Sequence, residues 1–100
     1  NVYPAEVENI ILQMEGIADV GVIGVPDEKW GEQVKAIVVL RPGYKVSEEE
    51  IMNHCRQHLA GFKTPKTVDY IEIIPRNAAG KMLKKDLRKP YWEGKDTFIS

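Results

Sequence analysis

The chain has 100 residues, which is the length of one small domain. Its 15 acidic and 14 basic residues nearly balance, so the domain as a whole is not expected to bind nucleic acid or an anionic membrane. The sequence has no long apolar run and no signal-peptide pattern, which predicts no transmembrane segment, and its single cysteine favours a reducing, cytoplasmic location.

The first predicted element is a helix that begins near Pro4. Proline suits the first turn of a helix, and Glu6 and Glu8 complement the positive end of its dipole. Gly16 is expected to stop this helix. Apolar residues recur at helical spacing and would form its buried stripe: Val7, Ile10, Ile11 and Met14.

Two strands are predicted next, at 20–25 and 34–40. The first is a short apolar run with two glycines, typical of a buried strand, and Pro26 and Asp27 are expected to end it. The second alternates in the way that strands do. The short connection predicts an antiparallel pair, although Trp30 and Gly31 make it longer than a tight hairpin.

A second long helix follows the turn at Pro42 and Gly43. Ser47 and Glu50 have the spacing of a capping box, and Ile51, Cys55 and Leu59 would form the inner stripe. A loop at 60–65, a third strand at 68–74 and a short helix complete the order α-β-β-α-β-α. This order predicts an α+β fold with a small three-stranded β-sheet backed by helices.

The second helix also carries two histidines that could be a metal site. His54 and His58 are four residues apart, but no third ligand lies at a convincing spacing, and a metal site needs three or four. We therefore interpret both as surface histidines and expect no metal to be held. Cys55 is interpreted as a small core residue, which is the usual fate of cysteine.

The segment 75–81 reads as a rigid loop that presents one lysine, Lys81. Pro75 fixes its own φ, Asn77 tolerates turn and left-handed conformations, and Gly80 adopts positive φ without steric cost. A lysine on such a loop suits an anionic ligand, whereas the alternative is an ordinary solvated charge. It is not the lysine of a P-loop, because that motif needs Gly at position 75 and Ser or Thr at position 82.

Two aromatic residues in polar loops are further candidates. Trp30 and Phe62 could mark a contact surface, or they could pack on the edge of the core. Lys63 and Lys66 lie beside Phe62 and would supply point charges for phosphate groups. Two rings with two lysines suit a carrier that combines a nucleotide, phosphates and a thiol arm.

The segment around Lys81 resembles the C-terminal signature of the adenylate-forming enzymes, which include acyl-CoA synthetases, firefly luciferase and the adenylation domains of peptide synthetases. Three other blocks are similar to this superfamily in the same order, at 1–8, 22–32 and 62–66. The tail at 89–94 is similar to bacterial fatty-acid–CoA ligases. The resemblance spans nearly the whole chain, and it implies that residues 1–100 form the mobile C-terminal lid domain of a larger enzyme.

This resemblance implies a role for each candidate residue. Lys81 would be the catalytic cation of carboxylate adenylation, and positions matching Trp30, Phe62 and Lys66 lie near bound CoA in the acyl-CoA synthetases. Gly31 and Lys63 would belong to the same CoA surface. One departure is Thr64, which stands where some relatives carry Arg and so removes one phosphate contact.

The resulting hypothesis is that the chain forms part of an ATP-dependent acyl-CoA ligase. ATP, CoA and Mg²⁺ would serve the full-length enzyme, with a carboxylic acid as substrate, and none of them would be held by this domain alone. The hinge and the N-terminal ATP- and acyl-binding domain are expected to precede the chain, which alone should be inactive. The alternatives are a peptide-synthetase adenylation domain and a non-catalytic binding module.

The last predicted helix carries four cations that could form a basic patch. They lie beside Asp86 and Glu93 and are interpreted as a solvated helix face: Lys84, Lys85, Arg88 and Lys89.

Overall fold

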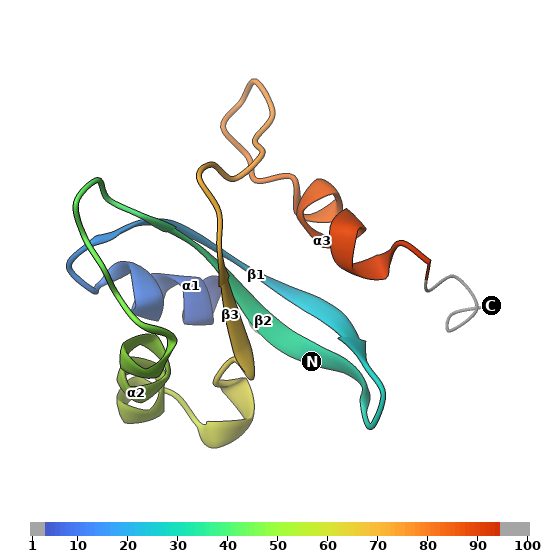
Figure 1. The fold of residues 1–100 in the computed structure, drawn as a ribbon, viewed down its shortest axis with the longest axis horizontal. Coiled ribbons are helices and arrows are strands. Elements are labelled where there is room, and N and C mark those ends of the chain that lie inside the picture. The colour runs from blue at the N-terminus through green and yellow to red at the C-terminus, as the bar shows by residue number, and fades with distance from the viewer. Residues whose placement is uncertain (1–3, 95–100) are drawn as a thin grey trace.

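The computed structural model describes residues 4–94 and confirms the predicted fold class and element order. A three-stranded sheet is accompanied by three α-helices and one short 3₁₀ helix (Figure 1). None of the helices in this range is long and apolar enough to cross a membrane. The elements are α1 (Pro4–Leu12), β1 (Ile17–Asp27), β2 (Gly31–Leu40), α2 (Glu48–His58), η1 (Gly61–Lys63), β3 (Thr67–Tyr70) and α3 (Lys84–Trp92).

The sheet has the order β1-β2-β3 and combines both strand directions. Strands β1 and β2 form an antiparallel hairpin in which Asp27 pairs with Gly31, so residues 28–30 form the connection, which is longer than a two-residue tight hairpin, as expected. The first strand continues through Pro26 and ends at Asp27, two residues beyond the predicted 20–25. Because β1 is an edge strand, the missing N–H of Pro26 costs no ladder bond there.

Strand β3 runs parallel to β2, and α2 forms the crossover between them. Its pairing runs from Thr67 opposite Lys35 to Tyr70 opposite Val38. The strand is shorter than the predicted 68–74, because the chain beyond it leaves the ladder to place Ile71 and Ile74 against the second core.

The two faces of the sheet are both covered, which gives the domain two small cores. Alternate residues of the strands pack against α1 and α2, including Val20, Val22, Ala36, Val38 and Val68. The intervening strand residues, including Ile23, Val25 and Ile37, pack against Leu87 of α3 and Ile74 of the segment before it. Gly21 allows this close approach, because a Cβ there would lie 2.7 Å from Leu87 Cδ2.

The helix ends follow the sequence in part. The capping box is confirmed, since Glu50 N donates to Ser47 Oγ at 3.1 Å and Ser47 N donates to Glu50 Oε1 at 2.9 Å. Helix α1 is shorter than predicted and ends at Leu12. Met14 packs on the core from the turn that follows, and Gly16 has φ = +94° at the start of β1.

At the outer edge of β1, side chains from α1 and α3 pair with the backbone of Val22. Glu8 accepts a hydrogen bond from Val22 N at 2.9 Å, and Lys84 donates to Val22 O at 2.9 Å. Lys84 and Glu8 also form an ion pair of 2.8 Å. Lys84 is thus a structural residue, which corrects its assignment to the solvated face, whereas Lys85, Arg88 and Lys89 are exposed.

Candidate functional site

The loop that carries Lys81 is a small hairpin of its own. Arg76 and Met82 form an isolated antiparallel bridge, Gly80 N donates to Asn77 O at 2.9 Å, and Asn77 N donates to Lys81 O at 2.9 Å. Gly80 has φ = +85°, as predicted, which is the left-handed residue that closes a three-residue hairpin loop. The loop projects from the body of the domain before α3 (Figure 1).

Asn77 holds the loop through its side chain. Its Oδ1 accepts hydrogen bonds from Ala79 N at 3.0 Å and from Lys81 N at 2.9 Å. Its own φ is not positive, so its tolerance of left-handed backbone is not what the fold uses.

Arg76 ties the same loop to the sheet. Its Nη2 lies 2.8 Å from both carboxylate oxygens of Asp19, and its Nη1 donates to Gly80 O at 2.8 Å. Asp19 belongs to β1, 57 residues earlier in the chain. The loop is therefore fixed from within by Asn77 and from the sheet by Arg76.

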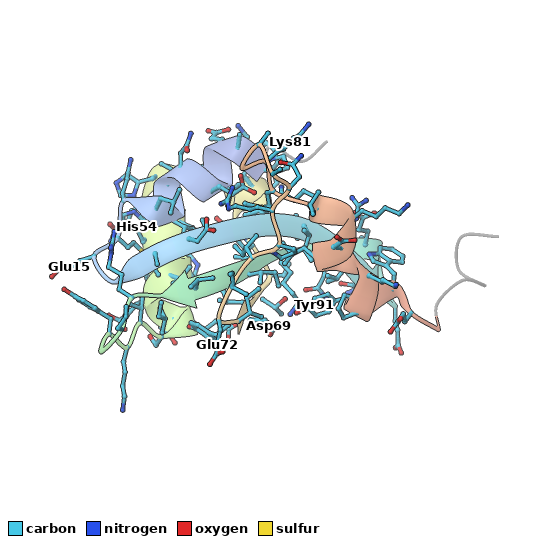
Figure 2. All side chains as sticks on the ribbon, turned by 90° about the horizontal axis from the view of Figure 1, so that it is seen from above. Glu15, His54, Asp69, Glu72, Lys81 and Tyr91 are labelled. Atoms are coloured by element: carbon cyan, nitrogen blue, oxygen red, sulfur yellow. The ribbon has the colours of Figure 1, made fainter. Side chains whose placement is uncertain are left out.

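Lys81 itself is exposed at the rim of the molecule (Figure 2). Its ammonium group makes no hydrogen bond or ion pair with any residue between 4 and 94. A fixed backbone thus carries a cation that is available to an anionic group on another molecule or domain.

The two aromatic candidates lie at the opposite end of the sheet from the Lys81 loop. Trp30 is 70% exposed at the tip of the β1-β2 hairpin, and Phe62 is 75% exposed in η1. Neither ring packs into the core, so the packing alternative was wrong for both. Because β2 and β3 are parallel, the segments that enter them meet at one end, and Lys66 N donates to Val34 O at 2.8 Å there.

The hairpin tip that bears Trp30 is held by Asp27. Asp27 Oδ1 accepts from Lys29 N at 2.8 Å and from Trp30 N at 3.3 Å, while Asp27 Oδ2 accepts from Gln33 Nε2 at 3.1 Å. Gly31 follows with φ = +82° and open space where a Cβ would be. The exposed indole is therefore presented by an ordered turn.

The lysines beside Phe62 have different surroundings. Lys63 forms an ion pair of 2.9 Å with Glu6 of α1, whereas Lys66 is exposed. Thr64 is buried, and its hydroxyl has no hydrogen-bond partner among residues 4–94. Lys66 is therefore the residue of this segment that presents a charge to solvent, and Thr64 adds no group to the surface.

One cluster that the sequence analysis did not identify joins β2, β3 and α3. The nearly buried Lys35 forms an ion pair of 3.2 Å with Asp69, and Tyr91 donates to Asp69 Oδ2 at 2.6 Å. Asp69 and Tyr91 lie close together in Figure 2. The available signal was the alternation of β2, which places Lys35 on the same buried face as Ile37 and so requires an acidic partner.

The cluster shifts the acid–base properties of its members. The hydrogen bond from Tyr91 is the main reason that the pKa of Asp69 is lowered, with partial burial opposing it and Lys35 adding to it. Burial, followed by the hydrogen bond to Asp69, raises the pKa of Tyr91 to about 12. Both shifts favour the ionised carboxylate and the neutral phenol in the folded state.

We expect Tyr91→Phe to destabilise the fold and to change its response to alkali. Loss of this half-exposed hydrogen bond should cost about 1 kcal/mol at pH 7. The raised pKa means that the contribution of Tyr91 is complete below its unfolded value of about 10 and is lost as the pH rises toward 12. Urea unfolding at pH 7 and between pH 10 and 12 should therefore show a smaller alkaline loss in the variant. Tyr44→Phe, which removes an exposed bond of 3.2 Å to Glu15, is the control, and an equal effect there would contradict the assignment.

The histidines have structural partners. His54 Nε2 is 2.9 Å from Ile10 O, and His58 Nδ1 is 2.9 Å from His54 O. Within residues 4–94, no group of three His, Cys, Asp or Glu side chains is placed to hold a metal ion. Cys55 is fully buried, as predicted, and burial raises its pKa to about 11.

Comparison with known proteins gives consistent matches. The profile of the AMP-binding enzyme C-terminal domain matches residues 6–81. A long-chain-fatty-acid–CoA ligase of Mycobacterium tuberculosis is 52% identical over 91 residues, covering 91% of this chain and 18% of the relative. A 2-succinylbenzoate–CoA ligase of Bacillus cereus is 44% identical over 89 residues, covering 89% of this chain and 18% of the relative.

Solved structures agree with these relatives. A fatty acyl-CoA synthetase from Mycobacterium tuberculosis superposes with a TM-score of 0.85 at 50% identity, covering 94% of this chain and 18% of that one. ATP-bound MatB from Rhodopseudomonas palustris superposes with a TM-score of 0.86 at 41% identity, covering 91% and 18%. The chain thus spans about a fifth of the length of the proteins that it matches.

Proposed function

Because the chain belongs to the AMP-binding enzyme C-terminal domain family, we propose that it is the mobile C-terminal domain of an ATP-dependent, AMP-forming acyl-CoA ligase. In this proposal the end of the domain that carries Lys81 serves adenylation of the acid, and the end that carries Trp30 and Phe62 serves transfer of the acyl group to CoA. The observation that carries it is the separation of two exposed features: Lys81, whose ammonium group has no partner among residues 4–94, and the rings of Trp30 and Phe62 at the other end of the sheet.

The Lys81 end serves the first half-reaction. A carboxylate oxygen of the substrate attacks the α-phosphorus of ATP, the bond to the bridging oxygen breaks, and pyrophosphate leaves. Negative charge gathers on the α-phosphate and on the leaving oxygen. A fixed ammonium group stabilises that transition state more than the separated reactants, and the ordered loop keeps its reorganisation cost low.

The aromatic end serves the second half-reaction. The CoA thiol, losing its proton, attacks the acyl carbonyl of the adenylate, and AMP leaves with the electrons of the acyl–oxygen bond. Trp30 and Phe62 offer exposed faces on which an adenine ring can stack, and Lys66 offers a charge to a phosphate. Gly31 keeps the surface beside Trp30 free of a side chain.

Lys63 has a narrower part in the same surface. Its ion pair with Glu6 ties η1 to α1, so it supports the segment that presents Phe62. We retain it in the CoA surface as a residue that orders this segment.

The two ends require a movement of the domain. A single rigid body cannot present both ends to one active site at once, so the domain must rotate about a hinge between the half-reactions. In this proposal ATP is served by Lys81, whose ammonium group has no partner among residues 4–94, and CoA is served by the exposed rings of Trp30 and Phe62. Mg²⁺ enters the proposal with ATP in the full-length enzyme, where it neutralises phosphate charge. The N-terminal domain of the same polypeptide is the proposed partner, a carboxylic acid the substrate, and the cytoplasm the location.

The function is tested on the full-length protein with ATP, CoA and a panel of carboxylic acids that includes fatty, aromatic and amino acids. We expect AMP and an acyl-CoA thioester to form in equal amounts, as read by mass spectrometry. Adenylates of amino acids with no transfer to CoA would indicate a peptide-synthetase domain instead. Absence of any acid-dependent ATP consumption across the panel would indicate a binding module.

A further inference from the structure

We infer that Arg76 and Asp19 form a brace that positions Lys81 for catalysis, an inference that rests on the proposed role of Lys81 in adenylation. Arg76 does not touch the lysine side chain. It acts on the backbone that carries it, and through Asp19 it connects that backbone to the sheet.

The geometry of one peptide unit carries the inference. Gly80 C=O and Lys81 N–H belong to the same peptide plane. The carbonyl accepts from Arg76 Nη1 at 2.8 Å, and the N–H donates to Asn77 Oδ1 at 2.9 Å. Because a peptide unit is planar, bonds to both of its sides fix its rotation about the chain, and this rotation sets the direction in which the Lys81 side chain leaves.

The other end of the brace is also fixed. Both oxygens of Asp19 lie 2.8 Å from Arg76 Nη2, and Asp19 Oδ1 accepts a further bond from Val20 N at 2.9 Å. Asp19 lies in β1, where Val20 pairs with Val38 of the central strand. The loop thereby acquires a polar connection to β1 in addition to the packing of Ile74 and Met82 on the second core.

The residue type at position 76 follows from this task. A guanidinium group is planar and carries five donors, so it can serve a carboxylate and a carbonyl in one geometry. An ammonium group is a point charge, and at this position it could keep the attraction to Asp19 without reaching both acceptors. Arginine is therefore required here for shape as well as for charge.

The effects on adenylation rate and on melting temperature distinguish a positioning role of this ion pair from a purely structural one. The Arg76 and Asp19 side chains are 39% and 25% exposed, and ion pairs at such sites stabilise folds by only about 0–1 kcal/mol. Misplacement of a catalytic group by about 1 Å can cost about a hundredfold in rate. Removal of the brace should therefore affect the adenylation rate far more than the melting temperature.

The test uses the full-length enzyme with Arg76→Gln, Arg76→Lys and Asp19→Asn, and with Arg88→Gln as the control. Arg88 is an exposed arginine of α3, so its substitution removes the same charge without touching the loop. Acid-dependent ATP–pyrophosphate exchange should fall by roughly tenfold to a hundredfold in Arg76→Gln, mainly in kcat, and less in Arg76→Lys and Asp19→Asn. Thioester formation from preformed acyl-AMP should stay within about twofold of the parent enzyme in all four, because the brace acts only on the Lys81 end.

Combining Arg76→Gln with Lys81→Ala decides whether Arg76 acts through Lys81. In Lys81→Ala, adding Arg76→Gln should change the residual exchange rate by less than about twofold, because the group that the brace positions is already absent. A loss that multiplies in this background would overturn the inference, since Arg76 would then act directly on the substrate. Equal loss of both half-reactions with a lowered melting temperature in both Arg76 variants would also overturn it.

The outcome for Lys81 separates this inference from the proposed function. Normal exchange in Lys81→Ala would overturn the role of Lys81 and this inference with it. Strongly reduced exchange in Lys81→Ala beside normal exchange in Arg76→Gln would overturn the brace alone.

Discussion

Lys81→Ala in the full-length enzyme is expected to slow acyl-adenylate formation by about 10²–10³-fold, or roughly 3–4 kcal/mol of transition-state stabilisation. The reason is that the ammonium group has no partner within residues 4–94 and is carried by a loop that Asn77 fixes from within and Arg76 ties to Asp19 of the sheet. Its stabilising effect would thus be realised in the transition state of the first half-reaction. ATP–pyrophosphate exchange measures that half-reaction, and thioester formation from preformed acyl-AMP measures the other.

Lys85→Ala is the matched control for this prediction. Lys85 is exposed at the start of α3, so its loss removes an equal charge four residues from Lys81. A comparable fall in exchange in Lys85→Ala would mean that the general positive field of this region matters and not one placed cation. Equal losses in both half-reactions of Lys81→Ala would mean that Lys81 acts in both orientations of the domain.

The architecture could be predicted because its signals are local. The apolar stripe of α1, the capping box of α2 and the alternation of β2 each depend on neighbours within a few residues. The ends of the elements could not be placed equally well. Strand β1 continues through Pro26 because it lies at the edge of the sheet, and strand order is a property of the whole fold.

The candidate site divides in the same way. The glycine turn before Lys81 followed from residue types in a short loop, whereas residue types left open whether Trp30 is exposed or packs on the core. The braces did not follow from residue types, because Arg76 meets Asp19 across 57 residues of sequence and Lys63 meets Glu6 across the same separation. A local sequence pattern therefore identifies an exposed candidate residue such as Lys81. The residues that fix its loop cannot be identified in this way, because they come from elements that are distant in the sequence and meet only in the folded domain.

Removal of the exposed rings is the second large effect that we expect. Trp30→Ala and Phe62→Ala should each raise the KM for CoA by roughly fivefold to 150-fold, since stacking of a base on an aromatic side chain contributes about 1–3 kcal/mol. Exchange should stay near normal, because neither ring belongs to the Lys81 end. Ile73→Ala is the control, since Ile73 is 78% exposed and lies beyond the C-terminal end of β3, away from the rings.

Lys66 allows the same surface to be tested by charge. If Lys66 contacts a phosphate of CoA, Lys66→Ala should also raise the KM for CoA. If the contacted group is the 3′-phosphate, the variant should also discriminate less than the parent enzyme between CoA and 3′-dephospho-CoA. Thermal melts of each variant come first, and both rings are exposed, so unchanged melting temperatures are expected. Should folded Trp30→Ala lose exchange as severely as Lys81→Ala, the two ends would not act in separate half-reactions, because a ring at the far end of the sheet would then be needed where the adenylate forms.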